Sequence, residues 1–269
     1  MRVAVNHVTR YRFDEAQDRI IQAVRMRPCE TDHQTVVAWR FDVDCDARLK
    51  KHEDGFGNEV TMIYVPGPVK AVDLVVTGEV LTDGAANGIV QGAAEPLPPE
   101  LFLRSSPRTA PAKAIGKFAH DIMSGEPTIE LLHKLNIAVG ERLTEKPGKP
   151  EDSRVASDVF EAGEATVREM ANVLVTAARA ANLPARFVSG YRASKSDEPA
   201  ESLHAWAEIY LSDLGWVGFD PAAGISPDQC YVRVAVGLDD ADTAPFSGSR
   251  AGPGEETLDV EVQVGAAQN

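Results

Sequence analysis

Long apolar segments and paired cysteines are both missing from this sequence. The three cysteines, Cys29, Cys45 and Cys230, are too few and too widely spaced for a disulfide framework or a CxxC metal site. No run of about 18 apolar residues is present, so we expect no membrane-spanning helix. The N-terminal residues lack the apolar core and the small-residue cleavage site of a signal peptide. We therefore expect a cytoplasmic protein that holds no metal and no cofactor.

Positive charge is scarce as well. The chain has 27 lysine and arginine residues against 41 aspartate and glutamate residues, which gives a formal net charge of −14. Binding to nucleic acid or to an anionic membrane surface needs a basic patch, so we expect neither. We interpret the acidic composition as an aid to solubility, and the acidic loop at Asp197, Glu198 and Glu201 as a solvated surface loop. The sequence shows no interface between copies of the chain, and a homo-oligomer stays an open alternative.

The first third of the chain has the pattern of β-strands. Apolar and polar residues alternate with period two, and β-branched and aromatic residues are frequent. The segment HEDGFGN places Asp54-Gly55 and Gly57-Asn58 between two such runs, which indicates a hairpin. The expected strands cover residues 2–13, 20–28, 36–45, 58–65 and 72–81. Short strands at this spacing predict an N-terminal β-sandwich domain over residues 1–85.

The rest of the chain changes period. Residues 86–105 are rich in glycine, alanine and proline, which predicts a linker or loop. Apolar residues then recur at spacings of three and four, which is typical of helices. The expected helices cover residues 111–123, 127–143 and 164–181, and the expected strands cover residues 185–192, 204–211, 215–221, 231–237 and 258–264. Helices followed by antiparallel strands predict an α+β core domain over residues 106–269.

A histidine and an aspartate stand out in this second half. His204 lies in an apolar-aromatic run, and Asp220 closes another such run sixteen residues later. The two residue types are typical of nucleophilic catalysis, in which the imidazole acts as a base and the carboxylate orients it. Two structural interpretations stay open, a core histidine and a pair that ties two strands together. Trp206 and Trp216 alternate on the expected strands and are interpreted as core aromatic residues.

Several motifs occur together in a recognisable order. LPARFVSGY, HAWAEIYL, LGWVGFDP and VRVAVGLDDADTAPFSG follow one another in the second half, and YRF, VRMRP and DGFGN occur in the first. They resemble bacterial transglutaminase-like proteins of the papain-like cysteine-peptidase superfamily, including the N-terminal β-domain of those proteins. The resemblance covers nearly the whole chain. It implies a papain-like fold and a Cys-His-Asp triad, with His204 as base and Asp220 as its orienter. The cysteine would stand at a helix start, where the helix dipole and the imidazolium lower its pKa.

The place of that cysteine holds another residue. The family's helix opens with Gly-x-Gly-Val-Cys-Gln-Asp-Phe-Ala-His, and counting back from the LPAR motif without a gap places this pattern on GEATVREMAN, residues 163–172. The resemblance then puts Val167 at the position of the nucleophile. Thr166 is an alternative nucleophile, but a threonine at a helix start is usually a cap. Cys230 is another, and it would have to approach His204 from a different element.

Other positions also depart from the family pattern. Ala222-Ala223 stand where Thr-Asn is usual, and Leu238-Asp239-Asp240 where Arg-Asp-Tyr is usual. This loss of polar site residues favours a pseudoenzyme that binds a peptide or protein partner without cleaving it. The expected partner is a catalytically competent paralogue or a peptide-processing protein, with the β-domain, its HEDGFGN hairpin and the Ala/Gly-rich linker as docking surface. The alternative is an amide or peptide hydrolase of altered mechanism, in which His204 and Asp220 activate a water molecule.

Overall fold

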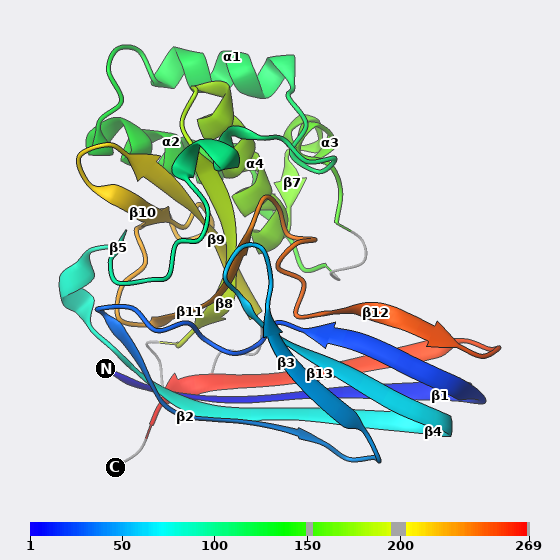
Figure 1. Ribbon diagram of the computed structural model, residues 1–269. Coiled ribbons are helices and arrows are strands. Elements are labelled where there is room, and N and C mark those ends of the chain that lie inside the picture. The colour runs from blue at the N-terminus through cyan, green and yellow to red at the C-terminus, as the bar shows by residue number, and fades with distance from the viewer. Residues whose placement is uncertain (149–152, 195–202, 268–269) are drawn as a thin grey trace.

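The computed structural model describes residues 1–148, 153–194 and 203–267, and the elements form three layers (Figure 1). Helices cover one face of a five-stranded sheet, and a six-stranded sheet packs on its other face. A strand-rich N-terminal region followed by an α+β core is therefore confirmed. The acidic loop expected at Asp197, Glu198 and Glu201 lies outside the described residues.

The six-stranded sheet is built on two long antiparallel strands, β1 and β4. Its members are β1 (Arg2–Val24), β2 (Gln34–Val43), β3 (Arg48–Glu53), β4 (Glu59–Thr82), β12 (Phe246–Ala251) and β13 (Glu256–Ala266). Register shifts between Arg12 and Arg19 let β1 join two of the strands expected from the sequence, because a bulge bends a ladder without ending it. The β3–β4 pairing confirms the hairpin predicted at HEDGFGN.

The last two strands correct the expected domain boundary. We predicted that residues 106–269 form the core domain, but β12 and β13 both pair antiparallel with β1. In this register Val264 lies opposite Val5, and both side chains are buried. The alternation in β13 was visible in the sequence, but its partner is a strand at the other end of the chain. The structure therefore assigns the strands that follow residue 245 to the N-terminal sheet.

The five-stranded sheet belongs to the core and is antiparallel throughout. Its order is β11 (Tyr231–Gly237), β8 (Ala185–Arg192), β9 (Leu203–Leu211), β10 (Gly215–Phe219) and β5 (Ile89–Val90). β5 comes from the segment predicted to be a linker, and a 3₁₀ turn at Pro99–Leu103 follows it. Residues 86–105 are thus partly built into the core sheet.

Four α-helices of the described residues cover the face of this sheet opposite the N-terminal strands. They are α1 (Lys113–Ile122), α2 (Ile129–Arg142), α3 (Ala156–Ala162) and α4 (Val167–Ala180), with short strands β6 (Thr144–Glu145) and β7 (Glu164–Ala165) between α2 and α4. α3 was not expected. α4 is buried along almost its whole length and packs against β9, so it is the central helix.

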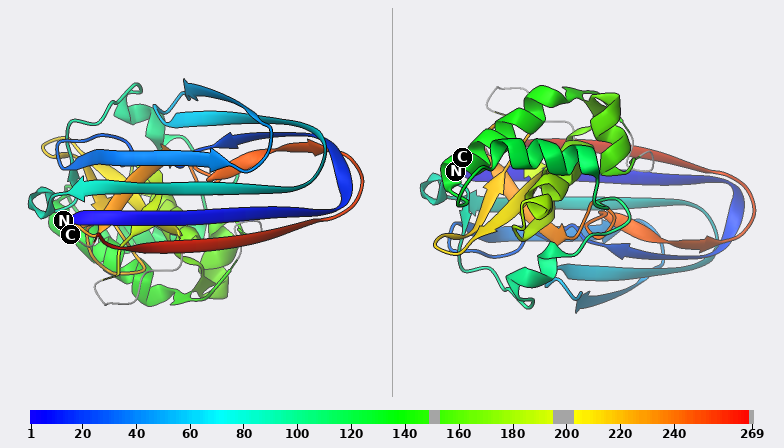
Figure 2. Two further views of the ribbon diagram at one scale, coloured as in Figure 1. Left: turned by 90° about the horizontal axis from the view of Figure 1, so that it is seen from below. Right: turned by 90° about the horizontal axis from the view of Figure 1, so that it is seen from above.

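Two hydrophobic layers hold the molecule together. One lies between the helices and the core sheet, and includes Leu135, Leu174 and Ala207. The other lies between the two sheets, and includes Val76 and Trp206. The N-terminal strands form one sheet, so the second layer of the expected sandwich is supplied by the core sheet. Seen from above, the long strands of the N-terminal sheet extend well beyond the helices (Figure 2).

Candidate functional site

His204 and Asp220 form a close pair at one end of the core sheet. His204 lies at the start of β9, and Asp220 follows the last residue of the neighbouring strand β10. The imidazole Nε2 is 2.6 Å from Oδ2 of Asp220. The carboxylate is fully buried, and the imidazole side chain is 11 % exposed. The structure therefore brings together the two residues that the sequence analysis singled out.

The carboxylate of Asp220 accepts hydrogen bonds from several directions. Its Oδ2 binds His204 and the hydroxyl group of Tyr231, which donates at 2.6 Å. Its Oδ1 accepts the backbone N–H groups of Ala222 at 3.0 Å and Ala223 at 3.2 Å. Burial alone would raise the pKa of Asp220, but the bonds to His204 and Tyr231 and the backbone outweigh it and lower the pKa. The carboxylate therefore stays ionised in the folded protein at neutral pH.

Tyr231 is a site residue that the sequence analysis missed. It begins β11, and its ring lies edge-on to the His204 ring, with centroids 5.6 Å apart. Burial, followed by the charge of Asp220, raises the pKa of Tyr231, so its hydroxyl group remains a donor. The ring of Trp206 packs against the ring of Tyr231, with centroids 5.5 Å apart. Trp206 is 2 % exposed, which confirms it as a core aromatic residue. Trp216, 5 % exposed, is confirmed likewise.

A side chain of α2 holds the turn that carries Asp220 in place. Asn136 is fully buried, and its Nδ2 donates to the carbonyl oxygen atoms of Asp220 at 3.2 Å and Ile225 at 3.3 Å. The N–H of Asp220 also donates to the Ile225 carbonyl at 2.8 Å. The alanines that replace the family's Thr-Asn thus contribute through their backbone, and the turn keeps its shape without polar side chains at 222 and 223.

The start of α4 is capped by Thr166. Its Oγ1 accepts the N–H of Glu169 at 3.2 Å, and the Glu169 carboxylate accepts the N–H of Thr166 at 2.9 Å, which makes a capping box. The interpretation of Thr166 as a cap is thereby confirmed. Val167 is the first residue of the helix and is half-buried against the hydrophobic layer beneath the helices.

Contacts along α4 show in which direction β8 runs beside this helix. At the far end of the helix, Arg179 donates to the carbonyl of Ala185, where β8 begins. Nearer its start, Asn172 donates to Asp240 at 2.8 Å, and the loop after Asp240 reaches Ser189 in β8. β8 therefore runs back along α4 from its end toward its start. His204 pairs with the residue after Ser189, so it lies level with the first half of the helix.

Asp240 is an unexpected anchor for the same region. It is fully buried and forms ion pairs with Arg108 and with Arg168, the second residue of α4, whose Nη2 is 3.4 Å from its Oδ2. The sequence analysis counted Asp240 among the losses of polar site residues. In the structure it binds two arginines and Asn172, and so holds the start of α4 to the loop after β11.

Cys230 is the remaining candidate nucleophile. None of the hydrogen bonds among the described residues joins a cysteine sulfur to the His204 ring, and Cys230 is buried between the two sheets. No disulfide joins the cysteines of the described chain. Within residues 1–148, 153–194 and 203–267 we also find no group of three His, Cys, Asp or Glu side chains placed to hold a metal ion. No helix in these segments is long and apolar enough to cross a membrane.

Comparisons with known proteins agree with this fold. Residues 3–81 match the bacterial transglutaminase-like N-terminal region, and residues 116–221 match the transglutaminase-like superfamily. An uncharacterized protein of Mycobacterium tuberculosis is 25 % identical, over 98 % of this chain and 92 % of its own length. One of Mycobacterium leprae is 24 % identical, over 98 % of each chain.

A solved structure shares the whole architecture. The crystal structure of a candidate cysteine protease from Cytophaga hutchinsonii superposes with a TM-score of 0.79 over 100 % of this chain and 91 % of its own, at 18 % identity. At that identity the likeness concerns the fold. Both sequence matches and this fold lead to the same conclusion: the chain is a transglutaminase-like protein, with a bacterial transglutaminase-like N-terminal region joined to a core of the transglutaminase-like superfamily.

Proposed function

We propose that this protein is a non-catalytic member of its superfamily, which binds a peptide or protein partner at the His204 end of the core sheet. One observation carries the proposal. The helix expected to open with a nucleophilic cysteine opens with Val167, whose isopropyl group can neither ionise nor attack a carbonyl carbon. The neighbouring hydroxyl of Thr166 is engaged as the helix cap. The polar groups around Asp220 then serve to hold the site in shape.

A hydrolysis assay tests the absence of catalysis. In other hydrolases, removal of the nucleophile lowers kcat by a factor on the order of 10⁶. We expect no measurable turnover of a panel of peptide amides by the purified protein, and no difference between it and a His204→Ala variant. Turnover that disappears in His204→Ala would reject the proposal. A matched check is Val167→Cys, which should gain labelling by a thiol-directed probe at residue 167 if the start of α4 is still organised for a thiolate.

Binding needs a separate measurement. Trp206 lies beside the site, with its ring centroid 6.4 Å from that of His204. We expect its fluorescence to change on titration with a peptide that binds there, and to lose that response in His204→Ala. A panel of peptides that leaves the fluorescence of the protein unchanged, and shows no binding by calorimetry, would contradict the binding function.

The intact His204–Asp220 pair favours one alternative, hydrolysis of an amide or ester by an activated water molecule. The pair has the short 2.6 Å separation that an oriented base requires, and the imidazole is partly exposed. Such an enzyme would show turnover that vanishes in His204→Ala. Turnover that survives the substitution would exclude this mechanism.

The proposal also covers the cellular location of the protein and the identity of its partner. We infer a cytoplasmic protein whose partner is a catalytically competent paralogue or another peptide-processing protein, docked through the N-terminal sheet. Support comes from the acidic composition and from strand β3 of the β3–β4 hairpin, whose residues are all exposed to solvent. Co-purification with a tagged paralogue tests the partner, and sedimentation of the purified chain shows whether copies of it associate.

A further inference from the structure

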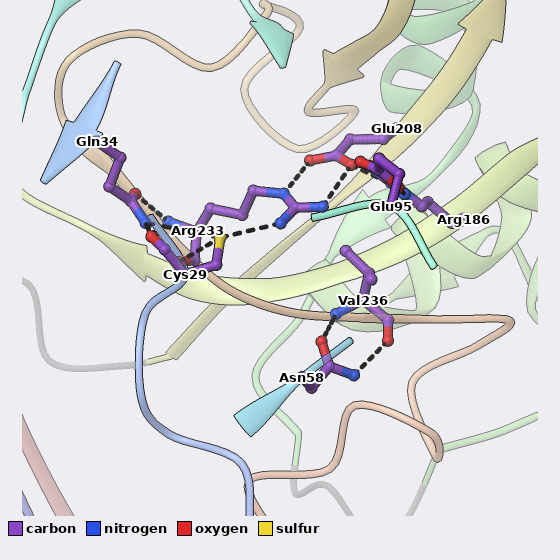
Figure 3. Close-up of polar contacts among 8 residues, drawn as sticks. All are labelled: Cys29, Gln34, Asn58, Glu95, Arg186, Glu208, Arg233 and Val236. Carbon is purple, nitrogen blue, oxygen red and sulfur yellow. Dashed lines mark hydrogen bonds and ion pairs between the residues drawn. The ribbon is translucent and has the colours of Figure 1, made fainter. Parts of the chain in front are cut away.

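Strand β11 is an edge strand of the core sheet whose outer edge is covered by side chains of the N-terminal region. β8 pairs with one edge of β11. On the other edge, Gln34 accepts the N–H of Arg233 and donates to its carbonyl, both at 2.8 Å. Asn58 does the same for Val236, again at 2.8 Å in both directions (Figure 3). A primary amide carries the same donor and acceptor as a peptide group, so each side chain replaces one residue of a missing neighbour strand.

Both amides are held firmly in place. Gln34 is 5 % exposed and Asn58 is 6 % exposed. Gln34 also donates to the carbonyl of Cys29 at 2.7 Å, and Asn58 donates to the carboxylate of Asp54 at 3.1 Å. The two buried amides together bind four backbone groups of β11, the N–H and C=O groups of Arg233 and Val236. They fix the position of the strand, because losing either amide would leave buried donors and acceptors without partners.

A network of ion pairs also holds strand β11 in place. The guanidinium of Arg233 contacts the sulfur of Cys29 at 3.0 Å and makes two bonds to Glu208 of β9, at 2.7 and 3.1 Å. Glu208 also accepts from Arg186, which in turn binds Glu95 (Figure 3). One chain of contacts therefore joins the N-terminal region, the segment before the helices and the core strands β8, β9 and β11.

This anchor lies two residues from Tyr231. Alternate residues of a strand face the same side, so Arg233 and Tyr231 point to one face of the core sheet. The ring of Tyr231 crosses β8 toward β9, where Gly190 leaves room for Trp206 beside it: a methyl group on Gly190 would lie 2.8 Å from the indole ring. The Tyr231 hydroxyl then reaches Asp220. One rigid strand thus links the N-terminal region to the His204–Asp220 pair.

We propose that the N-terminal region positions the His204–Asp220 pair through β11, with Gln34 and Asn58 as the clamp and Tyr231 as the arm that contacts the carboxylate. The proposal rests on the proposed function in one respect, namely that this pair is the working part of the binding site. It assigns a role to the N-terminal region beyond docking: a partner bound to that region would act on the site by shifting β11.

The proton between His204 and Asp220 reports the position of the pair. The protein has six histidines, so selective ¹⁵N-histidine labelling gives few signals. The signal of the His204 Nε2–H group is identified by its absence in a His204→Gln variant. A bonded Nε2–H exchanges slowly with water because exchange requires the bond to open. We expect Gln34→Met and Asn58→Leu to accelerate this exchange by about tenfold or more, since both remove hydrogen bonds that fix β11. Tyr231→Phe should accelerate it similarly with the clamp intact.

Gln263→Met is the matched control, because Gln263 is an exposed amide on β13 of the six-stranded sheet, and its side chain bonds to Glu261 of the same strand. It should leave the exchange rate unchanged. If a clamp variant does not fold, Tyr231→Phe, which leaves both amides in place, still tests the contact between β11 and the carboxylate. Unchanged exchange in all clamp variants, or in Tyr231→Phe, would overturn the proposal. The measurement uses no peptide, so its failure is distinct from a failure of the protein to bind one.

Discussion

Replacing Glu208 by glutamine should destabilise the protein far more than replacing an exposed glutamate. Glu208 is 1 % exposed and lies between the guanidinium groups of Arg186 and Arg233. Burial alone would raise the pKa of Glu208, but the charges and hydrogen bonds of the two arginines outweigh it and lower the pKa from 4.5 to about 2. A difference of that size corresponds to about 3 kcal/mol in favour of folding at neutral pH.

A second line of reasoning gives a similar magnitude. Removing one partner from a buried ion pair typically costs about 3–5 kcal/mol, because the remaining charge stays buried without compensation. Arg186 keeps Glu95 as a partner, whereas Arg233 keeps only Cys29 and its backbone bonds within the described residues. We therefore expect Glu208→Gln to lower the free energy of unfolding at pH 7 by about 3 kcal/mol, at the lower end of that range.

Denaturant unfolding at several pH values is the assay. The pKa of Glu208 is lower in the folded state, so its contribution is complete above pH 4.5 and disappears as the pH falls toward 2. The gap between the native protein and Glu208→Gln should shrink over the same interval. Glu79→Gln is the control, since Glu79 forms a surface pair with Arg2 that contributes about 1 kcal/mol or less. Equal losses for the two variants at pH 7 would refute the reasoning.

Three further changes have defined outcomes. Gly190→Ala should lower the free energy of unfolding by about 1–3 kcal/mol, because its methyl group would overlap the backbone carbonyl oxygen of Val232 and lie 2.8 Å from the ring of Trp206, and calorimetry measures the loss. Thr166→Ala should remove the α4 cap and cost about 1 kcal/mol, whereas Thr166→Ser should be nearly neutral; equal stabilities of the two would contradict the cap. Burial lowers the pKa of His7 from 6.5 to about 4, so protonation favours unfolding, and the native protein should lose stability as the pH falls from 6.5 to 4. His7→Gln should flatten that interval in pH-dependent unfolding curves, with its bond partner Tyr191 unchanged.

Local patterns in the sequence were sufficient for most elements of the fold. The alternation in residues 2–13 and 72–81 reflects burial of one face, and these segments lie within β1 and β4. The proline at the start of each helical segment falls just before α1 and α2. What the sequence could not supply was pairing between distant strands. The alternating run at 258–264 fits a strand in either sheet, and its pairing with β1 can be seen only in the structure.

The candidate site divides in the same way. His204 and Asp220 could be identified from the sequence because they occupy aromatic runs of a known pattern, and the structure places them together. Tyr231 could not, because its strand β11 is separated by β8 and β9 from β10, the strand that Asp220 follows. Gln34 and Asn58 carry no local signal at all. An amide that caps an edge strand is recognisable only when the strand and the amide are both in place.

The pairing of β13 with β1 has a consequence for how the chain is assembled. β1 is made well before β12 and β13, and the edge that pairs with them stays open until residues 246–266 have been made, so the N-terminal sheet cannot close before the helices and the core sheet have been translated. Until then β1 presents an unpaired edge, which is a hazard for association with other chains. The same closure brings residues 2 and 267 into hydrogen-bonding contact, with a backbone bond of 2.9 Å. A circular permutant joined at these residues and opened in an exposed loop should therefore fold with β13 next to β1 in the sequence, so that this edge of β1 is paired early.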